Sequence, residues 1–379
     1  MTLRVATLSS LADISAEDWD RCAASTGDAY NPFTSHAFLW ALEQSKSAVA
    51  KTGWAGSHLV LEENGKIVGI APCYLKSHSM GEYVFDHAWA DAFARAGGNY
   101  YPKLQVSVPF TPATGPRLLA ATAPQRMALA QGLVALCGEL EASSVHMTFV
   151  SDTEASESKW LHRNDIQFHW MNSGYVSFDE FLASLSSAKR KNIRKERKSL
   201  VEIGVSFECI TGDDLREAHW ESFYEFYMDT GSRKWGQPYL TRKFFRQIHE
   251  TMAKDILLVL AKRDGRTIAG ALNFIGGDAL YGRNWGCIEI HPNLHFETCY
   301  YQAIDFAIAR GLKRVEAGAQ GEHKLARGYI PVKTHSLHYM AHPGLSRAVA
   351  DYLEHERRAI DENQQELAEH TPFRHEERE

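Results

Sequence analysis

The sequence predicts two α/β cores in tandem, each a mixed, twisted β-sheet flanked by helices. Residues 58–75 (HLVLEENGKIVGIAPCYL) and residues 257–275 (LLVLAKRDGRTIAGALNFI) repeat one pattern: a strand, a tight polar turn and a second strand. Each of these hairpins is followed by a strand, an amphipathic helix and another strand. Parallel neighbouring strands need a crossover connection, usually a helix, so each half of the chain predicts a mixed sheet.

The two predicted hairpins have the same turn chemistry. Asn64-Gly65 joins the first pair of strands and Asp264-Gly265 joins the second. A type I′ turn requires positive φ at both central residues, and these dipeptides tolerate that backbone conformation best. We therefore expect the two hairpins to be equivalent elements of a repeat.

The remaining elements follow from hydrophobic periodicity. We expect Gly311 to end the second crossover helix, because glycine adopts the left-handed conformation that closes many helices. The predicted boundaries are 1–175 for the first domain, 176–345 for the second, and 346–379 for a C-terminal helix and tail. The expected helices cover residues 33–48, 124–141, 217–227, 240–252, 297–310 and 345–367, and the expected strands cover 103–108, 144–150, 279–290 and 313–317.

Composition limits the class of protein. The chain has 379 residues and a net charge of -6, so a site for a polyanion has to be local. Six scattered cysteines without a CxxC motif fit reduced thiols in a cytoplasmic protein, and no apolar run is long enough to span a bilayer. His335, His338 and His342 have helical spacing, but the segment alternates like a strand, and we expect no metal site.

Five segments resemble one family. The order hairpin, strand, helix, strand is that of the GNAT acyltransferase core, and two such cores in tandem resemble the FemAB-like family linked to peptidoglycan biosynthesis or recognition. The resemblance covers nearly the whole chain. Its most specific segments are residues 31–39 (NPFTSHAFL), 81–87 (GEYVFDH), 100–106 (YYPKLQV), 229–235 (DTGSRKW) and 316–324 (EAGAQGEHK).

This resemblance implies a transferase that moves an activated acyl or aminoacyl group onto an amine. The acceptor would be a small molecule or peptide, such as a cell-wall precursor, with no integral membrane contact. The implied donor is aminoacyl-tRNA or acyl-CoA, with no tightly bound cofactor. Coenzyme-A-using GNAT enzymes have a glycine-rich loop before the crossover helix, which binds pyrophosphate. Residues 289–296 (EIHPNLHF) contain no glycine, which favours a donor other than acetyl-CoA.

Four residues are candidates for catalysis. Fem enzymes have a phenylalanine-lysine pair before a glycine in the segment that resembles residues 321–329, and strict spacing places Ala326 at the lysine position. Lys324 and Arg327 flank it, so either cation could stabilise an oxyanion, or both could be solvated. Glu289 and Glu316 are the candidate bases, the alternative being salt-bridged structural acids.

The other candidates are binding residues. We expect an active cleft between the two halves, walled by residues 318–329, 231–236 and 83–89, with residues 229–239 forming a loop. An alternative for that loop is a plain surface connection. The residues assigned to substrate binding are Asp86, His87, Arg233, Lys234, Trp235, Tyr239, Gly318, Gln320, Gly321, His323 and Tyr329.

A basic segment opens the second half. Residues 189–198 (KRKNIRKERK) contain seven cations and one acid, and apolar spacing predicts a helix over residues 178–201. We assign Lys189, Arg190, Arg194 and Lys195 to the phosphates of the donor. The alternative is a solvated helix face.

Two other functions remain open from the sequence. A non-catalytic protein with this fold could recognise a cell-wall precursor, and the absence of an acyl-donor site would favour it. An RNA-binding module would rest on residues 189–198 alone, against the acidic net charge. A shift in melting temperature with tRNA or with coenzyme A separates these alternatives.

Overall fold

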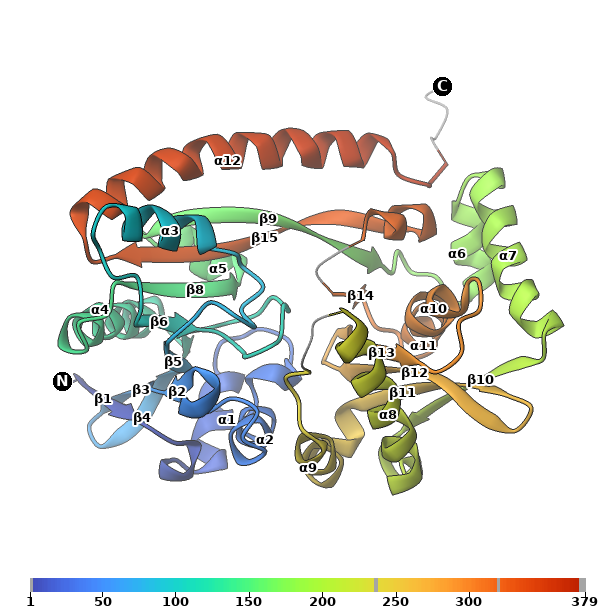
Figure 1. The fold of residues 1–379 in the computed structure, drawn as a ribbon, viewed down its shortest axis with the longest axis horizontal. Helices are drawn as coiled ribbons and strands as arrows, with labels where there is room; N and C mark the ends of the chain where they lie inside the picture. Colours follow the sequence, from blue (N-terminus) through green and yellow to red (C-terminus); the bar gives the residue numbers. More distant parts are fainter. Residues whose placement is uncertain (1–2, 235–237, 319–320, 375–379) are drawn as a thin grey trace. The chain divides into compact units, whose positions relative to one another are not determined.

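The computed structural model describes residues 3–234, 238–318 and 321–374, without the side chains of residues 232–234 and 322 (Figure 1). The chain forms two compact units. Unit 1 comprises Met1–Asp165, Tyr239–Phe244 and Lys333–Glu362, and unit 2 comprises Ile166–Pro238, Phe245–Val332 and Asn363–Glu379. The chain passes from one unit to the other after residues 165, 238, 244, 332 and 362.

Unit 1 has two sheets. The first is antiparallel, with strand order β1-β3-β4-β7, and the second contains β15, β8, β6, β5 and β2 in that order. The elements are β1 (Leu3–Leu8), α1 (Ala16–Ala24), α2 (His36–Gln44), β2 (Trp54–Gly56), β3 (His58–Glu63), β4 (Lys66–Ala71), β5 (Cys73–Lys76), α3 (His87–Arg95), β6 (Lys103–Val106), β7 (Leu119–Ala120), α4 (Ala123–Glu139), β8 (Ser144–Val150), α5 (Asp152–Glu157), and parts of β9 (Leu161–Met171), β15 (Tyr329–Met340) and α12 (Pro343–Glu369).

The predicted strand–helix–strand unit of the first half is confirmed. β6 and β8 are parallel, with α4 as part of their connection. A capping box between Thr122 and Gln125 starts α4. One face of the sheet packs on this helix through a continuous apolar core that includes Leu104, Val106, Leu129, Leu133, Val145 and Met147.

Unit 2 repeats the plan in one sheet, with strand order β10-β11-β12-β13-β14-β9. β13 and β14 are parallel, and a helical segment connects them. The elements are α6 (Phe178–Ser184), α7 (Ser187–Glu202), β10 (Val205–Thr211), α8 (Glu217–Lys234), α9 (Arg242–Met252), β11 (Ile256–Arg263), β12 (Arg266–Ile275), β13 (Ala279–Cys287), α10 (Leu294–Phe296), the π-helix η6 (Glu297–Tyr301), α11 (Gln302–Ala309), β14 (Arg314–Glu316) and the 3-10 helix η7 (Glu322–Arg327).

The predicted turns are confirmed. Asn64 and Gly65 have φ of 51° and 78°, and Asp264 and Gly265 have φ of 51° and 76°. Both turns thus have the positive φ pair that a type I′ hairpin requires. Gly311, with φ of 64°, follows α11 as expected.

Three local predictions are wrong. Residues 229–234 do not form a loop, because α8 continues through them, and Gly231 lies so close to Pro238 that a Cβ would be 2.5 Å from the proline Cγ. The helix expected over 178–201 breaks at Leu185, which is extended and pairs with Phe373. The crossover helix begins earlier than expected and contains the π-helical turn η6.

All six cysteines are free thiols. Within the described ranges, no helix combines the length and apolar character that a membrane crossing requires.

Candidate functional site

The turn after strand β14 carries a buried lysine. Gly318 and Gly321, with φ of 77° and 121°, let the chain leave the strand and enter η7. Lys324 on η7 is 1% exposed, and its Nζ donates a hydrogen bond to the Gly318 carbonyl at 2.9 Å. Burial lowers the pKa of Lys324 to about 8, while Cys299 favours the charged form.

Arg327, the other predicted cation, is held by three partners. Its Nη2 donates to Glu196 Oε1 at 2.9 Å, and its Nη1 donates to the carbonyl of His323 at 2.8 Å. The guanidinium carbon lies 3.3 Å from the ring centroid of Phe296. Arg327 therefore connects the turn to helix α7. His323, a predicted substrate-binding residue, takes part in this connection through its backbone carbonyl.

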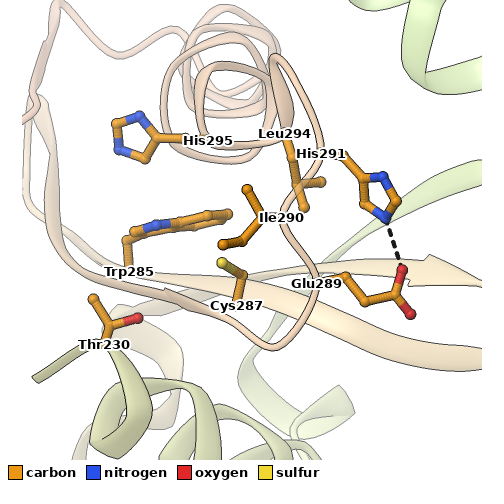
Figure 2. A pocket seen from close by; sticks show the side chains of 8 residues that line it. All are labelled: Thr230, Trp285, Cys287, Glu289, Ile290, His291, Leu294 and His295. Carbon is orange, nitrogen blue, oxygen red and sulfur yellow. Dashed lines mark hydrogen bonds and ion pairs between the residues drawn. The ribbon is translucent and has the colours of Figure 1, made fainter. Parts of the chain in front are cut away.

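A cavity of about 290 Å³ lies at the end of β13 (Figure 2). Trp285, Cys287 and Ile290 are drawn around its centre, and Thr230 comes from the end of α8. The lining residues are Thr230, Trp285, Cys287, Glu289, Ile290, His291, Leu294 and His295.

Aromatic rings link this cavity to the turn that carries Lys324. The ring of His295 lies 5.2 Å from that of Trp285 and 5.2 Å from that of Tyr300, between centroids. The hydroxyl of Tyr300 is 2.9 Å from Nε2 of His323. The predicted residue Tyr329 is fully buried, with its ring centroid 5.5 Å from that of Tyr300. The cavity and the turn thus share one aromatic cluster.

Glu289 lies at the rim of the cavity. Its Oε2 is 2.7 Å from His291 Nε2 and 3.2 Å from Arg263 Nη1 (Figure 2 draws the histidine contact). The hydrogen bond from His291 lowers the pKa of Glu289, and Arg263 acts in the same direction. A half-buried carboxylate that accepts hydrogen bonds from two side chains is a weak proton acceptor.

Glu316 is buried in a polar row across three strands. It lies opposite Tyr281 on β13 and His169 on β9, so the three side chains share one face of the sheet. Arg314 Nε donates to Glu316 Oε1 at 2.9 Å, whereas Oε2 has no hydrogen-bond partner among the described residues and lies 3.9 Å from His169 Nε2. Burial lowers the pKa of His169, so its imidazole is kept neutral.

The predicted phosphate-binding cations all belong to helix α7. Arg194 forms an exposed ion pair with Asp179 at 3.0 Å. Lys189, Arg190 and Lys195 are in no ion pair with another described residue, and Lys195 is exposed. The helix therefore presents cations to solvent while its apolar residues Ile193 and Leu200 are buried.

Asp86 belongs to a buried charge cluster in unit 1. Lys103 Nζ lies 2.5 Å from Asp86 Oδ2 and 2.7 Å from Glu82 Oε2, and Lys76 Nζ lies 3.7 Å from Glu82 Oε1. Burial alone would lower the pKa of Lys103, but the two carboxylates outweigh it and raise that pKa. Asp86 thus holds the loop before α3 onto the sheet.

Of the remaining predicted residues, two belong to unit 1 and four lie wholly or partly outside the described part of the chain. His87 is exposed and stacks on Phe85, with centroids 6.3 Å apart, and Tyr239 stacks on Phe110 at 4.7 Å. All four belong to unit 1. The side chains of Arg233 and Lys234, and all of Trp235 and Gln320, lie outside the described residues.

Sequence reasoning missed several site residues. Glu196 was counted only as the single acid of the basic segment, and His169, Trp285 and His295 were not singled out. A signal was present for Glu196, which falls on the buried face of the helix with Ile193 and Leu200 at i–3 and i+4. Among the described residues, no group of three or more His, Cys, Asp or Glu could hold a metal ion.

The comparisons agree with this architecture. The FemAB-like family model, described as peptidoglycan biosynthesis/recognition, matches residues 10–375. No curated protein sequence matches the chain.

Solved structures of the same fold cover nearly the whole chain. The crystal structure of FemX matches with a TM-score of 0.56 and 12% identity over 89% of this chain and 98% of that chain. L-PGS from Bacillus licheniformis matches with a TM-score of 0.54 and 9% identity over 89% and 97%. The C-terminal domain of a putative lysylphosphatidylglycerol synthetase from Agrobacterium fabrum matches with a TM-score of 0.53 and 9% identity over 89% and 95%. The predicted fold class, tandem GNAT-like α/β domains, is confirmed.

Proposed function

Because the chain belongs to the FemAB-like family of peptidoglycan biosynthesis and recognition proteins, we propose that it transfers an activated acyl or aminoacyl group onto an amine. The observation that carries this proposal is Lys324, a buried cation in the turn after β14, whose ammonium has one hydrogen-bond partner among the described residues, the carbonyl of Gly318. Ligands of open α/β sheets collect outside the carboxyl ends of strands, and an ammonium with three protons can donate to a substrate oxygen as well as to the Gly318 carbonyl.

The transfer needs an oxyanion stabiliser and a proton acceptor. The acceptor amine attacks the carbonyl carbon of the donor, the carbonyl oxygen becomes negative, and Lys324 stabilises that charge. The proton lost by the amine passes to the pair formed by Glu316 and neutral His169, and it then returns to the leaving oxygen or sulfur of the donor. In this scheme Arg327 positions the turn, since its guanidinium is occupied by Glu196 and His323.

Donor and acceptor sites follow from charge and shape. Helix α7 offers exposed cations for the phosphates of aminoacyl-tRNA or of acyl-CoA. The cavity beside Trp285 and Leu294 is lined mainly by apolar atoms, and its volume is large enough for one amino-acid side chain or acyl group. The missing glycine loop in residues 289–296 supports aminoacyl-tRNA over acyl-CoA.

Labelled donors test the proposal directly. The protein is incubated with labelled aminoacyl-tRNA or with labelled acetyl-CoA, together with a nucleotide-linked cell-wall precursor, and the label on the precursor is counted. We expect transfer from one donor, and a loss of about a hundred- to thousandfold in Lys324→Met. Binding of the precursor without transfer from either donor would contradict the enzyme and favour a recognition protein, and binding of tRNA alone would favour an RNA-binding module.

A further inference from the structure

Helix α7 presents cations to solvent, whereas its carboxylate, Glu196, contacts other elements of unit 2. Glu196 accepts hydrogen bonds from Arg327 Nη2 at 2.9 Å and from the hydroxyl of Tyr301. The next residue, Arg197, forms ion pairs with Glu297 at 2.9 Å and with Asp305 at 2.8 Å. Two consecutive residues of α7 therefore hold the turn that carries Lys324 and the helix that follows β13.

The contacts of Arg327 extend this connection to the reactive lysine. Arg327 is 7% exposed, stacks on Phe296 and donates to the carbonyl of His323, the residue before Lys324. Glu196 is the carboxylate that neutralises Arg327. The ion pair of Glu196 and Arg327 thus connects α7 to the backbone beside Lys324.

The exposed face of α7 is electrostatically unfavourable by itself. Like charges are spaced by four residues in the pairs Arg190 and Arg194, Lys191 and Lys195, and Arg194 and Lys198. Such pairs destabilise a helix, and only the exposed contacts Arg194–Asp179 and Lys198–Glu202 offset them among the described residues. A bound polyanion would neutralise this face and stabilise the helix.

We infer that Glu196 is a positioning residue through which phosphate binding on helix α7 orders the turn Glu322–Arg327 and places Lys324 for transfer. The inference rests on the proposed function, because it uses α7 as the donor's phosphate site. It adds that binding of the donor and the position of Lys324 are linked, so a bound donor favours the arrangement that transfers the acyl group. The shared ligand chemistry is phosphate, from the backbone of tRNA or from coenzyme A.

Hydrogen exchange measures the coupling without needing turnover. Exchange is followed in peptides that cover residues 321–329, in free protein, with deacylated tRNA and with coenzyme A. In the wild type we expect the ligand that binds to slow exchange there. In Glu196→Gln we expect the ligand still to bind but to slow exchange there about fivefold less, because a neutral amide forms weaker hydrogen bonds than a carboxylate.

Two further variants keep this test decisive. Glu202→Gln is the matched control on the same helix: its partner Lys198 is exposed, and it should keep both affinity and protection. If Glu196→Gln lowers the melting temperature, Tyr301→Phe removes one hydrogen bond to Glu196 without changing a charge and should show a smaller loss of protection.

The two possible failures differ. If tRNA or coenzyme A binds but residues 321–329 exchange equally in the wild type and in Glu196→Gln, the positioning role is wrong and the transferase proposal stands. If neither ligand binds wild-type protein and charge reversal at Lys189, Arg190, Arg194 and Lys195 changes nothing, both the positioning role and the donor site on α7 are wrong.

Discussion

Lys324 Nζ donates to the carbonyl of Gly318 at 2.9 Å, and Lys324 is in no ion pair with another described residue. A buried ammonium without a carboxylate partner carries a desolvation cost, which lowers its pKa from 10.5 to about 8. Among the described residues no carboxylate compensates this charge, and a substrate oxygen can do so.

The first prediction concerns the pH dependence of the proposed transfer. Lys324 is charged below its pKa of about 8 and neutral above it. If the cation stabilises the oxyanion, the ratio of wild-type to Lys324→Met rates should fall as pH rises through about 8. Taking the ratio removes the pH dependence that comes from ionisation of the attacking amine, because this contribution is the same for both proteins. A ratio that grows above pH 8 would instead make the neutral amine a general base.

The same pKa predicts a stability effect. The unfolded lysine binds a proton up to about pH 10.4, whereas the folded one releases it near pH 8. Between these values the unfolded state binds more protons, so the free energy of unfolding rises with pH. Lys324→Met should lack this rise and should be more stable at pH 7, by up to about 3 kcal/mol. Urea unfolding at pH 7 and pH 10 measures both, and equal pH slopes would contradict the prediction.

The charge cluster of unit 1 should tolerate joint neutralisation of its charges better than the loss of its lysine alone. Lys103→Met leaves Glu82 and Asp86 buried without their main counter-ion, which should cost about 3–5 kcal/mol of unfolding free energy. Adding Glu82→Gln and Asp86→Asn should recover most of that loss. Arg21→Met is the control, since the exposed pair with Asp18 is worth about 1 kcal/mol or less. Chemical unfolding of the four proteins would contradict this ranking if Lys103→Met matched Arg21→Met.

The cavity beside β13 should bind part of a substrate. Cys287→Met adds volume to its lining without adding charge, so it should raise KM for the ligand that enters and leave kcat nearly unchanged. Cys209→Met, at an exposed thiol on β10 in the same unit, is the matched control. Steady-state kinetics of both variants test this prediction. If Cys287→Met and Cys209→Met have the same KM, no substrate enters the cavity.

The repeated hairpins should respond equally to the same substitution. Gly65→Ala and Gly265→Ala each place a Cβ on a residue with positive φ, and no heavy atom beyond the adjoining residues lies within 4 Å of that Cβ. The cost is therefore one of backbone conformation alone, about 1 kcal/mol or more in both cases. Thermal unfolding should show similar losses, and a marked difference would mean that the two turns are not equivalent.

Much of the fold was determined by local sequence. Asn64-Gly65 and Asp264-Gly265 set the hairpin turns through backbone φ, and the apolar stripe of residues 124–141 set a crossover helix through its period. These features act within a few residues, so the sequence alone determines them. The helical extent of residues 229–234 escaped prediction because Gly231 has low helix propensity, which indicated a loop, whereas α8 continues through it and places it close to Pro238.

The site was decided by the tertiary structure. From the sequence, Lys324 and Arg327 were equivalent cations three residues apart, and only packing distinguished them. Arg327 meets Glu196, which is 131 residues away in the chain, whereas Lys324 is buried and, among the described residues, donates to one carbonyl. Electrostatics depends on distance in space and on exclusion of water, and neither is encoded in the spacing of residues along the chain.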